Sequence, residues 1–255
     1  MTEHIQVSMH GAAQILRMAR PEKKNSLNGA MYRALSAALA EGDASPDIAA
    51  HVICGSDGIF CAGNDIGEFL AGGERAGAVL ADVLTFIQLL PVVKKPVIAA
   101  VAGPAVGIGT TLLFHCDLVY AAPNATFSTP FLDLGLIPEA ASSLLMPRQM
   151  GYQRAFEMLV LGETFSAEKA ANAGFVNKIV PQESLEAEAV RAAERLAAKP
   201  PGALAIARRL LRGEATGILQ RTGEEAELFR QRLSSPEARE AFQAFFEKRP
   251  PKFAG

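Results

Sequence analysis

The chain opens with an alternation of polar and apolar residues. Residues 3–10 and 12–19 alternate on either side of Gly11, a pattern that predicts a β-hairpin. Helical spacing follows a basic loop at residues 22–25, and Ser26 or Asn28 can cap that helix. Its apolar face is formed by Leu27, Met31, Leu35 and Leu39.

Short apolar runs form a second pattern and mark buried strands. They stand at residues 50–54, 97–102 and 118–122, with a helical pattern at 76–90. The recurring alternation of strand and helix predicts an α/β fold with parallel crossovers. Helical patterns dominate from residue 152, interrupted by one short strand at 175–180, and cover 152–161, 166–173, 184–198, 202–212, 218–232 and 236–247.

The composition changes from mixed α/β to nearly all helical near residue 195. We therefore expect residues 1–195 to form the core and residues 196–255 to form a helical appendage that could be swapped between subunits. A chain of 255 residues that is 49% hydrophobic and 20% charged can bury one large core.

The most distinctive stretch is Gly103–Asp117, where the apolar run Pro96–Ala102 leads into a glycine-rich turn and then a nearly uncharged helix. Gly103, Gly107 and Gly109 permit positive φ angles and close approach of another group. The first N–H groups of a helix are unsatisfied and carry the positive end of its dipole. The junction therefore predicts an oxyanion or phosphate site. It has neither the GxGxxG spacing nor the Lys-Ser or Lys-Thr of a nucleotide loop.

Charge narrows the possible partners. The chain has 25 basic and 27 acidic residues, so its net charge of −2 offers no electrostatic basis for binding nucleic acid or an anionic membrane. Neither a run of about 18 apolar residues nor a signal-peptide pattern occurs. We expect a cytoplasmic protein.

Cysteine and histidine usage does not indicate a metal site. Cys54, Cys61 and Cys116 lack paired metal-ligand spacing and are interpreted as reduced, packed thiols. The four histidines show no HxxxH or HxH pairing, and His115 is interpreted as a packed helix residue rather than a ligand.

Two stretches together resemble the crotonase family, the enoyl-CoA hydratase and isomerase superfamily. They are Phe60–Ile66 (FCAGNDI) and Lys95–Gly103 (KPVIAAVAG), which continues through GIG to Cys116 and Asp117. The resemblance spans the chain through RPEKKNSLN, CDLVYA, LGLIPEAASS and FSAEKAANAGFVNKIV. It implies a β-β-α spiral with two roughly perpendicular sheets, a C-terminal trimerisation region and an acyl-CoA thioester substrate. A homotrimer or a dimer of trimers is then expected, with coenzyme A as part of the substrate and no separate cofactor.

In that family two backbone N–H groups hold the thioester oxygen, and the resemblance places these donors at Asn64 and Ile108. Removing a proton next to a thioester builds charge on the carbonyl oxygen, and one preorganised donor is typically worth about 10²- to 10³-fold in rate. Without the resemblance, the two residues would be interpreted as a tight turn and a core contact.

The resemblance also implies the contacts of the coenzyme A portion. Asp65, Ile66 and Gly67 match the loop that lies against adenine and pantetheine. Lys23 and Lys24 are candidates for the phosphates, with a solvated basic loop as an equal alternative. The expected substrate contacts are Lys23, Lys24, Ala62, Asn64, Asp65, Ile66, Gly67, Gly107, Ile108, Thr111 and Phe131.

The residues at the positions of the family's catalytic glutamates indicate which reaction to expect. Hydratases of the family use two glutamates, at positions that here carry Thr111 and Phe131, and neither side chain is a general base. Glu139 instead resembles the single glutamate of peroxisomal-type Δ3-Δ2-enoyl-CoA isomerases, which takes a proton from C2 and returns it at C4. An apolar wall would raise its pKa toward neutrality. Candidates for that wall are Phe131, Leu134, Leu136 and Ile137.

The sequence is also compatible with several alternatives. Pro138 and Glu139 also suit the first turn of a helix, and Asp133 is a second nearby acid. A hydratase with displaced acids, a thioester hydrolase and a silent acyl-CoA binder fit the same resemblance. An RNA-binding relative would use the basic segment Arg208–Arg212, which equally suits a subunit or solvent face.

Overall fold

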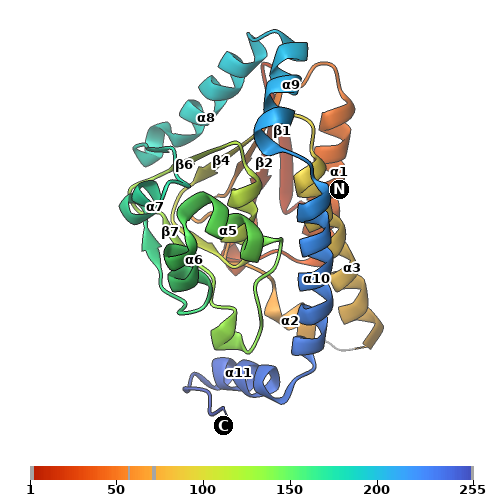
Figure 1. The fold of residues 1–255 in the computed structure, drawn as a ribbon, viewed down its shortest axis with the longest axis vertical. Helices are drawn as coiled ribbons and strands as arrows, with labels where there is room; N and C mark the ends of the chain where they lie inside the picture. Colours follow the sequence, from red (N-terminus) through yellow and green to blue (C-terminus); the bar gives the residue numbers. More distant parts are fainter. Residues whose placement is uncertain (1–2, 57, 71–72, 254–255) are drawn as a thin grey trace.

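A six-stranded sheet forms the centre of the protein (Figure 1). The computed structural model describes residues 3–56, 58–70 and 73–253. The strand order is β1-β2-β3-β4-β6-β9, with β1 and β2 antiparallel and all other pairs parallel. The bounds are β1 Ile5–His10, β2 Ala13–Met18, β3 Ala50–Cys54, β4 Val97–Val101, β6 Leu118–Ala121 and β9 Lys178–Ile179.

The N-terminal predictions are confirmed. β1 and β2 form the expected hairpin, and α1 (Gly29–Ala44) makes the crossover from β2 to the parallel strand β3. Asn28 is the N-cap of α1, because its side-chain oxygen accepts from the backbone N–H of Met31 at 2.9 Å.

A second, three-stranded sheet consists of β5 (Pro104–Val106), β7 (Thr126–Ser128) and β8 (Phe165–Ser166). β5 follows β4 directly and β7 follows β6, so successive turns of the chain contribute to both sheets. This is the two-sheet α/β arrangement expected from the sequence.

The helices follow the predicted pattern with small shifts at their ends. The glycines at positions 67, 72, 73 and 77 predict a helix turn and a loop, and Gly72 within this segment lies outside the described residues. The remaining bounds are α2 Ile66–Leu70, α3 Gly73–Leu89, α4 Ile108–Thr111, α5 Ser142–Met150, α6 Tyr152–Leu159, α7 Ala167–Ala173, α8 Gln182–Ala197, α9 Pro201–Arg212, α10 Thr216–Leu233 and α11 Pro236–Glu247.

Two elements are shorter than predicted. The helix after the glycine-rich turn is α-helical only over α4 and continues as a 3-10 turn at Leu112–His115 before β6 begins. The strand expected at 175–180 is reduced to β9. Asn177 precedes β9, and its side-chain oxygen accepts from the backbone N–H of Val119 at 2.7 Å, where a longer strand would use a backbone carbonyl.

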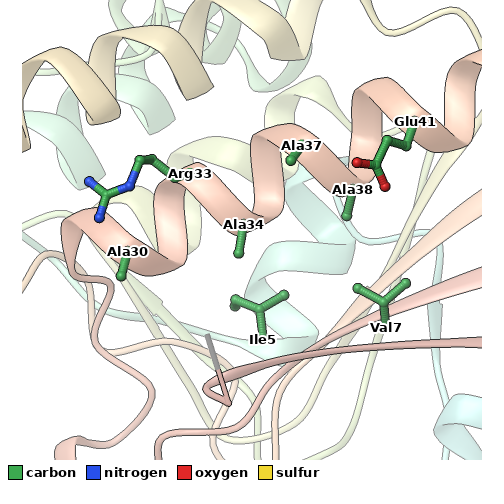
Figure 2. A pocket seen from close by; sticks show the side chains of 8 residues that line it. All are labelled: Ile5, Val7, Ala30, Arg33, Ala34, Ala37, Ala38 and Glu41. Carbon is green, nitrogen blue, oxygen red and sulfur yellow. The ribbon is translucent and has the colours of Figure 1, made fainter. Parts of the chain in front are cut away.

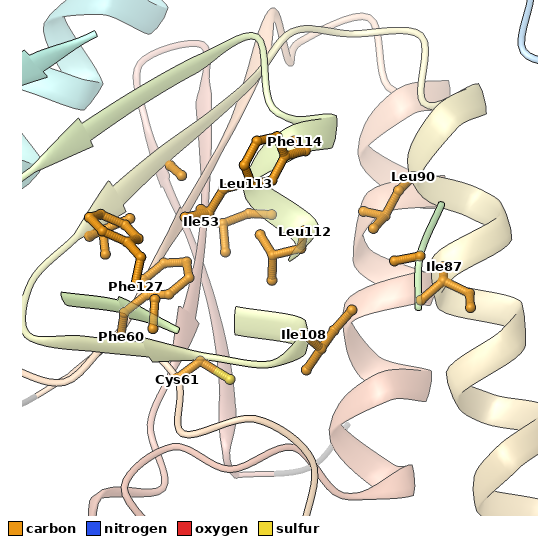
Figure 3. Close-up of a cluster of buried hydrophobic side chains, with 14 of the residues drawn as sticks. Ile53, Phe60, Cys61, Ile87, Leu90, Ile108, Leu112, Leu113, Phe114 and Phe127 are labelled. Carbon is orange, nitrogen blue, oxygen red and sulfur yellow. The ribbon is translucent and has the colours of Figure 1, made fainter. Parts of the chain in front are cut away.

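The central strands of the sheet are buried on both faces. Figure 3 shows the larger cluster, in which Ile53 of β3 packs with Phe127 of β7 and with residues that follow the glycine turn, including Ile108 and Leu112. Helix α8 covers the opposite face, where Leu185 and neighbouring alanines form a second cluster with the strands. This double cover accounts for the uniform burial of strands β3 and β4.

The cysteines are thiols, as expected. Cys54 and Cys61 are buried, Cys116 is half-buried, and none forms a disulfide. Burial raises the pKa of each thiol to about 12, so none is prepared to act as a thiolate. Within residues 3–56, 58–70 and 73–253, no helix has the length and apolarity to span a bilayer, and no cluster of metal-ligating side chains occurs.

The C-terminal helices differ in what they contact. α10 packs against α3 and α5, whereas α11 packs against the 3-10 turn Leu132–Leu134. Within α9, Arg208 pairs with Asp117 at 3.0 Å and Arg212 donates to the carbonyl oxygen of His115 at 2.8 Å. Two arginines of the basic segment are thus used inside the chain, which weakens the RNA-binding alternative.

Candidate active site

Two chain segments meet to form the centre of the site. The N–H of Cys61 donates to the carbonyl of Pro104 at 3.0 Å, and the N–H of Val106 donates back to the carbonyl of Cys61 at 2.9 Å. A Cβ on Gly109 would lie only 2.7 Å from the oxygen of Cys61, so only glycine allows this approach. The FCAGNDI segment therefore lies directly beside the glycine-rich turn.

Gly107 connects β5 to α4 in a conformation that favours glycine. Its φ of 55° and ψ of −119° direct the chain from the small sheet into the helix, and its N–H donates to the carbonyl of Ser128 at 2.9 Å. Ile108 is the first residue of α4, and its side chain is fully buried in the core (Figure 3). Its side chain thus anchors the helix start, while its N–H is one of the groups that a helix leaves unpaired.

Asn64 presents a second unpaired N–H. The residues on either side of it bond to Leu27: the N–H of Leu27 donates to the carbonyl of Gly63, and the N–H of Asp65 donates to the carbonyl of Leu27. Within the described part of the chain, no protein group accepts a hydrogen bond from the N–H of Asn64 or of Ile108. The structure therefore leaves both expected donors available to a ligand.

A cavity of about 370 Å³ opens at this junction and is mainly apolar. Five of the expected substrate contacts line it: Ala62, Asn64, Ile66, Gly107 and Phe131. The rest of the wall includes residues of the C-terminal helices: Phe229, Leu233, Ala241, Phe242 and Phe245.

Glu139 is buried, with only 5% of its surface exposed. Its Oε1 has no hydrogen-bond partner among the described residues, and the side chain of Asn64 is near enough to affect the carboxylate. Burial raises the pKa of Glu139 to about 7; the nearby Glu225 adds to this rise and the side chain of Asn64 opposes it. A carboxylate in this setting can exchange a proton near neutral pH.

The helix start predicted at Pro138 and Glu139 is wrong. Ala140 and Ala141 both have positive φ angles, of 57° and 55°, and α5 begins only at Ser142. Glu139 thus lies on a tight turn before the helix and is not an acid of its first turn. The turn is held partly by His115, whose Nε2 donates to the carbonyl of Ala140 at 2.7 Å. His115 is a buried packing residue, as predicted, and burial lowers its pKa to about 4.

A second cavity of about 370 Å³ lies between α3 and α10 and has Glu139 in its wall. Phe229 lines both this cavity and the first one. The wall on the α3 side includes Leu80, Val83, Leu84 and Ile87. The carboxylate of Glu139 therefore borders an apolar cavity that shares the side chain of Phe229 with the first cavity.

Tyr32 of α1 completes a buried polar chain that sequence analysis missed. Its hydroxyl donates to Oδ1 of Asn64, and the side chain of Asn64 in turn lowers the pKa of Glu139. Tyr32 is fully buried, and burial raises its pKa well above the usual value, with the nearby Glu139 adding to the rise. A buried tyrosine usually needs a hydrogen-bond partner for its hydroxyl. The position of Tyr32 on the apolar face of α1 was therefore the feature of the sequence that could have predicted this contact.

The two positions of the hydratase glutamates are filled differently here. Thr111 is fully buried, lines none of the cavities described above, and its hydroxyl has no partner among the described residues. Phe131 is buried and lines the first cavity. Asp133, the second acid considered, is exposed and also borders the first cavity.

Only some of the residues expected to contact coenzyme A lie close to one another. Asp65 pairs with Arg20 at 2.8 Å, and its other oxygen accepts from the N–H of Gly67 at 3.1 Å. The side chains of Lys23 and Lys24 are exposed, and the carbonyl of Lys24 accepts from the N–H of Ala62 at 3.0 Å. The turn that carries Lys23 and Lys24 thus lies beside the segment at Ala62, and neither lysine side chain lines either cavity.

Another cavity, of about 470 Å³, lies between β1 and α1 (Figure 2). Alanines of α1 face Ile5 and Val7 across it, with Arg33 and Glu41 on the helix. None of the predicted site residues lines it, so it is separate from the candidate active site.

This two-sheet α/β fold with C-terminal helices is that of the crotonase superfamily of acyl-CoA enzymes. More specifically, residues 9–255 match the family described as enoyl-CoA hydratase/isomerase, and the chain belongs to that family. An enoyl-CoA hydratase/isomerase structure from Pseudoalteromonas atlantica superposes with a TM-score of 0.94 at 36% identity, covering 99% of this chain and all of that one.

Relatives carry both activity names. A protein of Rhodobacter capsulatus named "Probable enoyl-CoA hydratase" is 36% identical over 245 residues, which is 94% of either chain. "Enoyl-CoA delta isomerase 2" of Rattus norvegicus is 35% identical over 251 residues, 96% of this chain and 64% of the rat protein. The family is thus established, and the reaction has to be argued from the site.

Proposed function

We propose that the protein is a Δ3-Δ2-enoyl-CoA isomerase with Glu139 as its single acid–base group. The observation that carries this proposal is the carboxylate itself, which is buried, has a free Oε1 and lies beside the loop of Asn64. A pKa of about 7 suits a group that must first accept and then donate a proton. The rat isomerase supports the assignment at the level of sequence similarity.

The N–H groups of Asn64 and Ile108 serve as the oxyanion hole in this proposal. Both lack a protein acceptor in the described part of the chain, and the positive end of α4 lies at Ile108. As the C2 proton leaves, charge develops on the thioester oxygen, and two fixed donors stabilise it more than they stabilise the neutral substrate.

The reaction transfers one proton between two carbons. Oε1 of Glu139 takes a proton from C2 of the 3-enoyl-CoA, and the C–H electron pair becomes part of an enolate whose charge rests on the thioester oxygen. When the enolate collapses, C2 and C3 form the new double bond, and the electrons of the former C3–C4 double bond take the proton at C4. Glu139 returns to its ionised state, so one base is sufficient.

The two cavities suit the two ends of such a substrate. In this proposal, pantetheine lies along Ala62, Ile66 and Gly67, with Asp65 shaping that loop through its bond to the N–H of Gly67. The phosphates would extend toward Lys23 and Lys24. The acyl tail enters the apolar space between α3 and α10, so the reacting carbons pass Glu139.

Hydration of a 2-enoyl-CoA is the second candidate, favoured by the name of the Rhodobacter capsulatus relative. Thr111 and Phe131 at the two glutamate positions argue against it. Hydration would have to combine Glu139 with a displaced acid such as the exposed Asp133.

We also propose that the protein assembles as a homotrimer or a dimer of trimers through its C-terminal helices. No residue of α9 is buried within the chain, and Ile206, Leu210 and Leu211 are 54%, 73% and 88% exposed. An apolar helix face of this kind is suited to contact with another subunit.

Replacing Glu139 by Gln tests the isomerase proposal. The variant keeps the shape of the side chain but removes the base, so turnover of a 3-enoyl-CoA should fall by about 10²- to 10⁴-fold. Affinity for a saturated acyl-CoA should stay nearly unchanged. Glu183→Gln, at an exposed position of α8, is the matched control. Substantial turnover by the Glu139 variant would exclude it as the base.

A further inference from the structure

The turn that carries Glu139 has an unfavourable backbone. Ala140 and Ala141 are consecutive residues in the left-handed region, and both are fully buried. Alanine has a Cβ that opposes this conformation, and such residues persist only where surrounding contacts hold them. The position of Glu139 therefore depends on the contacts that keep Ala140 and Ala141 in this conformation.

Glu225 of α10 binds the far side of this turn. Its Oε2 accepts from the N–H of Ala141 at 2.6 Å, and its Oε1 accepts from the N–H and the hydroxyl of Ser143 at 3.0 and 2.5 Å. One carboxylate thus receives three hydrogen bonds from a turn more than 80 residues earlier in the chain. In Figure 1, α10 runs beside α3 with α5 on its other flank.

Glu225 is itself buried, with 4% of its surface exposed. Arg221, one turn earlier on α10, donates to the hydroxyl of Ser143 at 3.1 Å and gives the buried carboxylate a nearby positive charge. A buried acid with three donors and a cation is costly to place for packing alone, since an apolar side chain would fill the same space.

We propose that Glu225 is a positioning residue: its carboxylate holds the Ala140–Ala141 turn so that Oε1 of Glu139 faces the reacting carbons. The inference rests on the proposed function, because it assigns Glu225 to the same reaction. It links α10, which also lines the acyl cavity, to the orientation of the base. When α10 packs against the core, its Glu225 therefore also brings Glu139 into position.

A second effect of Glu225 is electrostatic. Its negative charge raises the pKa of Glu139 in addition to the rise caused by burial. The other polar or titratable groups that interact with Glu139 are Asn64, Tyr32 and the thiol of Cys61; Arg221 faces Glu225. Without the charge of Glu225, Glu139 should titrate at lower pH and be a weaker base.

Glu225→Gln tests both effects. A shift of the turn by a fraction of an ångström to 1 Å should lower kcat for a 3-enoyl-CoA by roughly tenfold to a hundredfold. KM should stay within about twofold, because the thioester donors are untouched. NMR of the labelled glutamate carboxyls, with Glu139→Gln to assign the signal, should show Glu139 titrating at lower pH. Glu214→Gln, an exposed acid just before α10, should match the wild type.

The outcomes separate the two proposals. If the wild type fails to isomerise any 3-enoyl-CoA, the proposed function fails, while the titration of Glu139 still reports on Glu225. If Glu225→Gln keeps the wild-type kcat and the same titration, the positioning role is overturned. Should that variant not fold, Glu225→Asp keeps the charge but is too short for the same bonds, and its kcat should fall at least about fivefold. A folded Glu225→Asp protein with wild-type kcat would also overturn the inference.

Discussion

The hydroxyl of Tyr32 donates to Oδ1 of Asn64 at the centre of the site. With Oδ1 bound to Tyr32, the amide nitrogen is the end left to donate elsewhere, and the side chain of Asn64 lowers the pKa of Glu139. Asn64 therefore has two separate parts in the proposed reaction: its backbone N–H faces the thioester oxygen, and its side chain orients the base.

Tyr32→Phe removes only the hydroxyl that donates to Asn64. The amide of Asn64 is then free to turn, and a buried acceptor loses its partner, so kcat should fall by about threefold to tenfold with KM nearly constant. Steady-state kinetics on a 3-enoyl-CoA would measure this. Tyr152→Phe is the matched control, since Tyr152 is 66% exposed. Equal kinetics of both variants would show that the Tyr32 bond does not support catalysis.

The raised pKa of Glu139 predicts opposite pH effects on activity and stability. The ionised form is the base, so kcat/KM should rise with pH through an inflection near 7. The pKa in the folded protein lies above the ordinary value of 4.5, so the stabilising contribution of Glu139 is fully present below that value and is lost as pH rises through about 7.

Glu139→Gln cannot ionise and should escape this loss. Its free energy of unfolding relative to wild type should therefore increase by ~2–3 kcal/mol between acidic and mildly alkaline pH. Urea denaturation at a fixed protein concentration measures the difference. A difference that stays constant with pH would mean that Glu139 has an ordinary pKa in the folded protein.

Gly107→Ala tests the backbone that presents the N–H of Ile108. The added Cβ has room, with Phe131 at 3.9 Å, but the positive φ is unfavourable for alanine. We expect a stability loss of about 1–2 kcal/mol and, because the donor moves, a fall in kcat of about tenfold or more. Gly11→Ala is the matched control, with a φ of 56° and open space in the distant hairpin. Equal activity of both variants would show that the backbone at Gly107 does not position the N–H of Ile108 for catalysis.

Gly223 offers a test of where the acyl tail lies. It faces the cavity between α3 and α10, and a Cβ built on it meets no atom within 4 Å. Gly223→Leu should fill part of that cavity and lower kcat/KM for long-chain substrates by at least about tenfold relative to short-chain ones. Gly217→Leu is the control, since Gly217 also has open space, lies on the same helix and is exposed. An unchanged chain-length profile would place the tail elsewhere.

Local patterns were sufficient to predict most of the fold. The hairpin of β1 and β2, the crossover through α1 and the cap at Asn28 each depend on residues close together in the sequence. The predictions were wrong where a tertiary contact overrides a local preference. Glu139 precedes a helix in sequence and suits its first turn, yet contacts from His115 and Glu225 hold the next two residues in the left-handed region.

The site was predictable to the extent that it resides in contiguous motifs. Asn64 and Gly107 belong to two such motifs, and the structure brings both to one cavity. Tyr32, Phe229 and Glu225 come from helices far away in the sequence and carry no motif of their own. Only the packing of α1 and α10 around the junction places them at the site, and helical periodicity does not specify that packing.

In the proposed reaction, the single buried carboxylate of Glu139 performs a 1,3-proton transfer. The most direct measurement is turnover of paired substrates by the purified wild-type protein: 3-enoyl-CoA and 2-enoyl-CoA thioesters of matched chain length, with products identified by mass and by the absorbance of the conjugated thioester. The account predicts conversion of 3-enoyl-CoA to trans-2-enoyl-CoA and no addition of water to the 2-enoyl-CoA. Efficient hydration of 2-enoyl-CoA with the 3-enoyl-CoA left unchanged would contradict it.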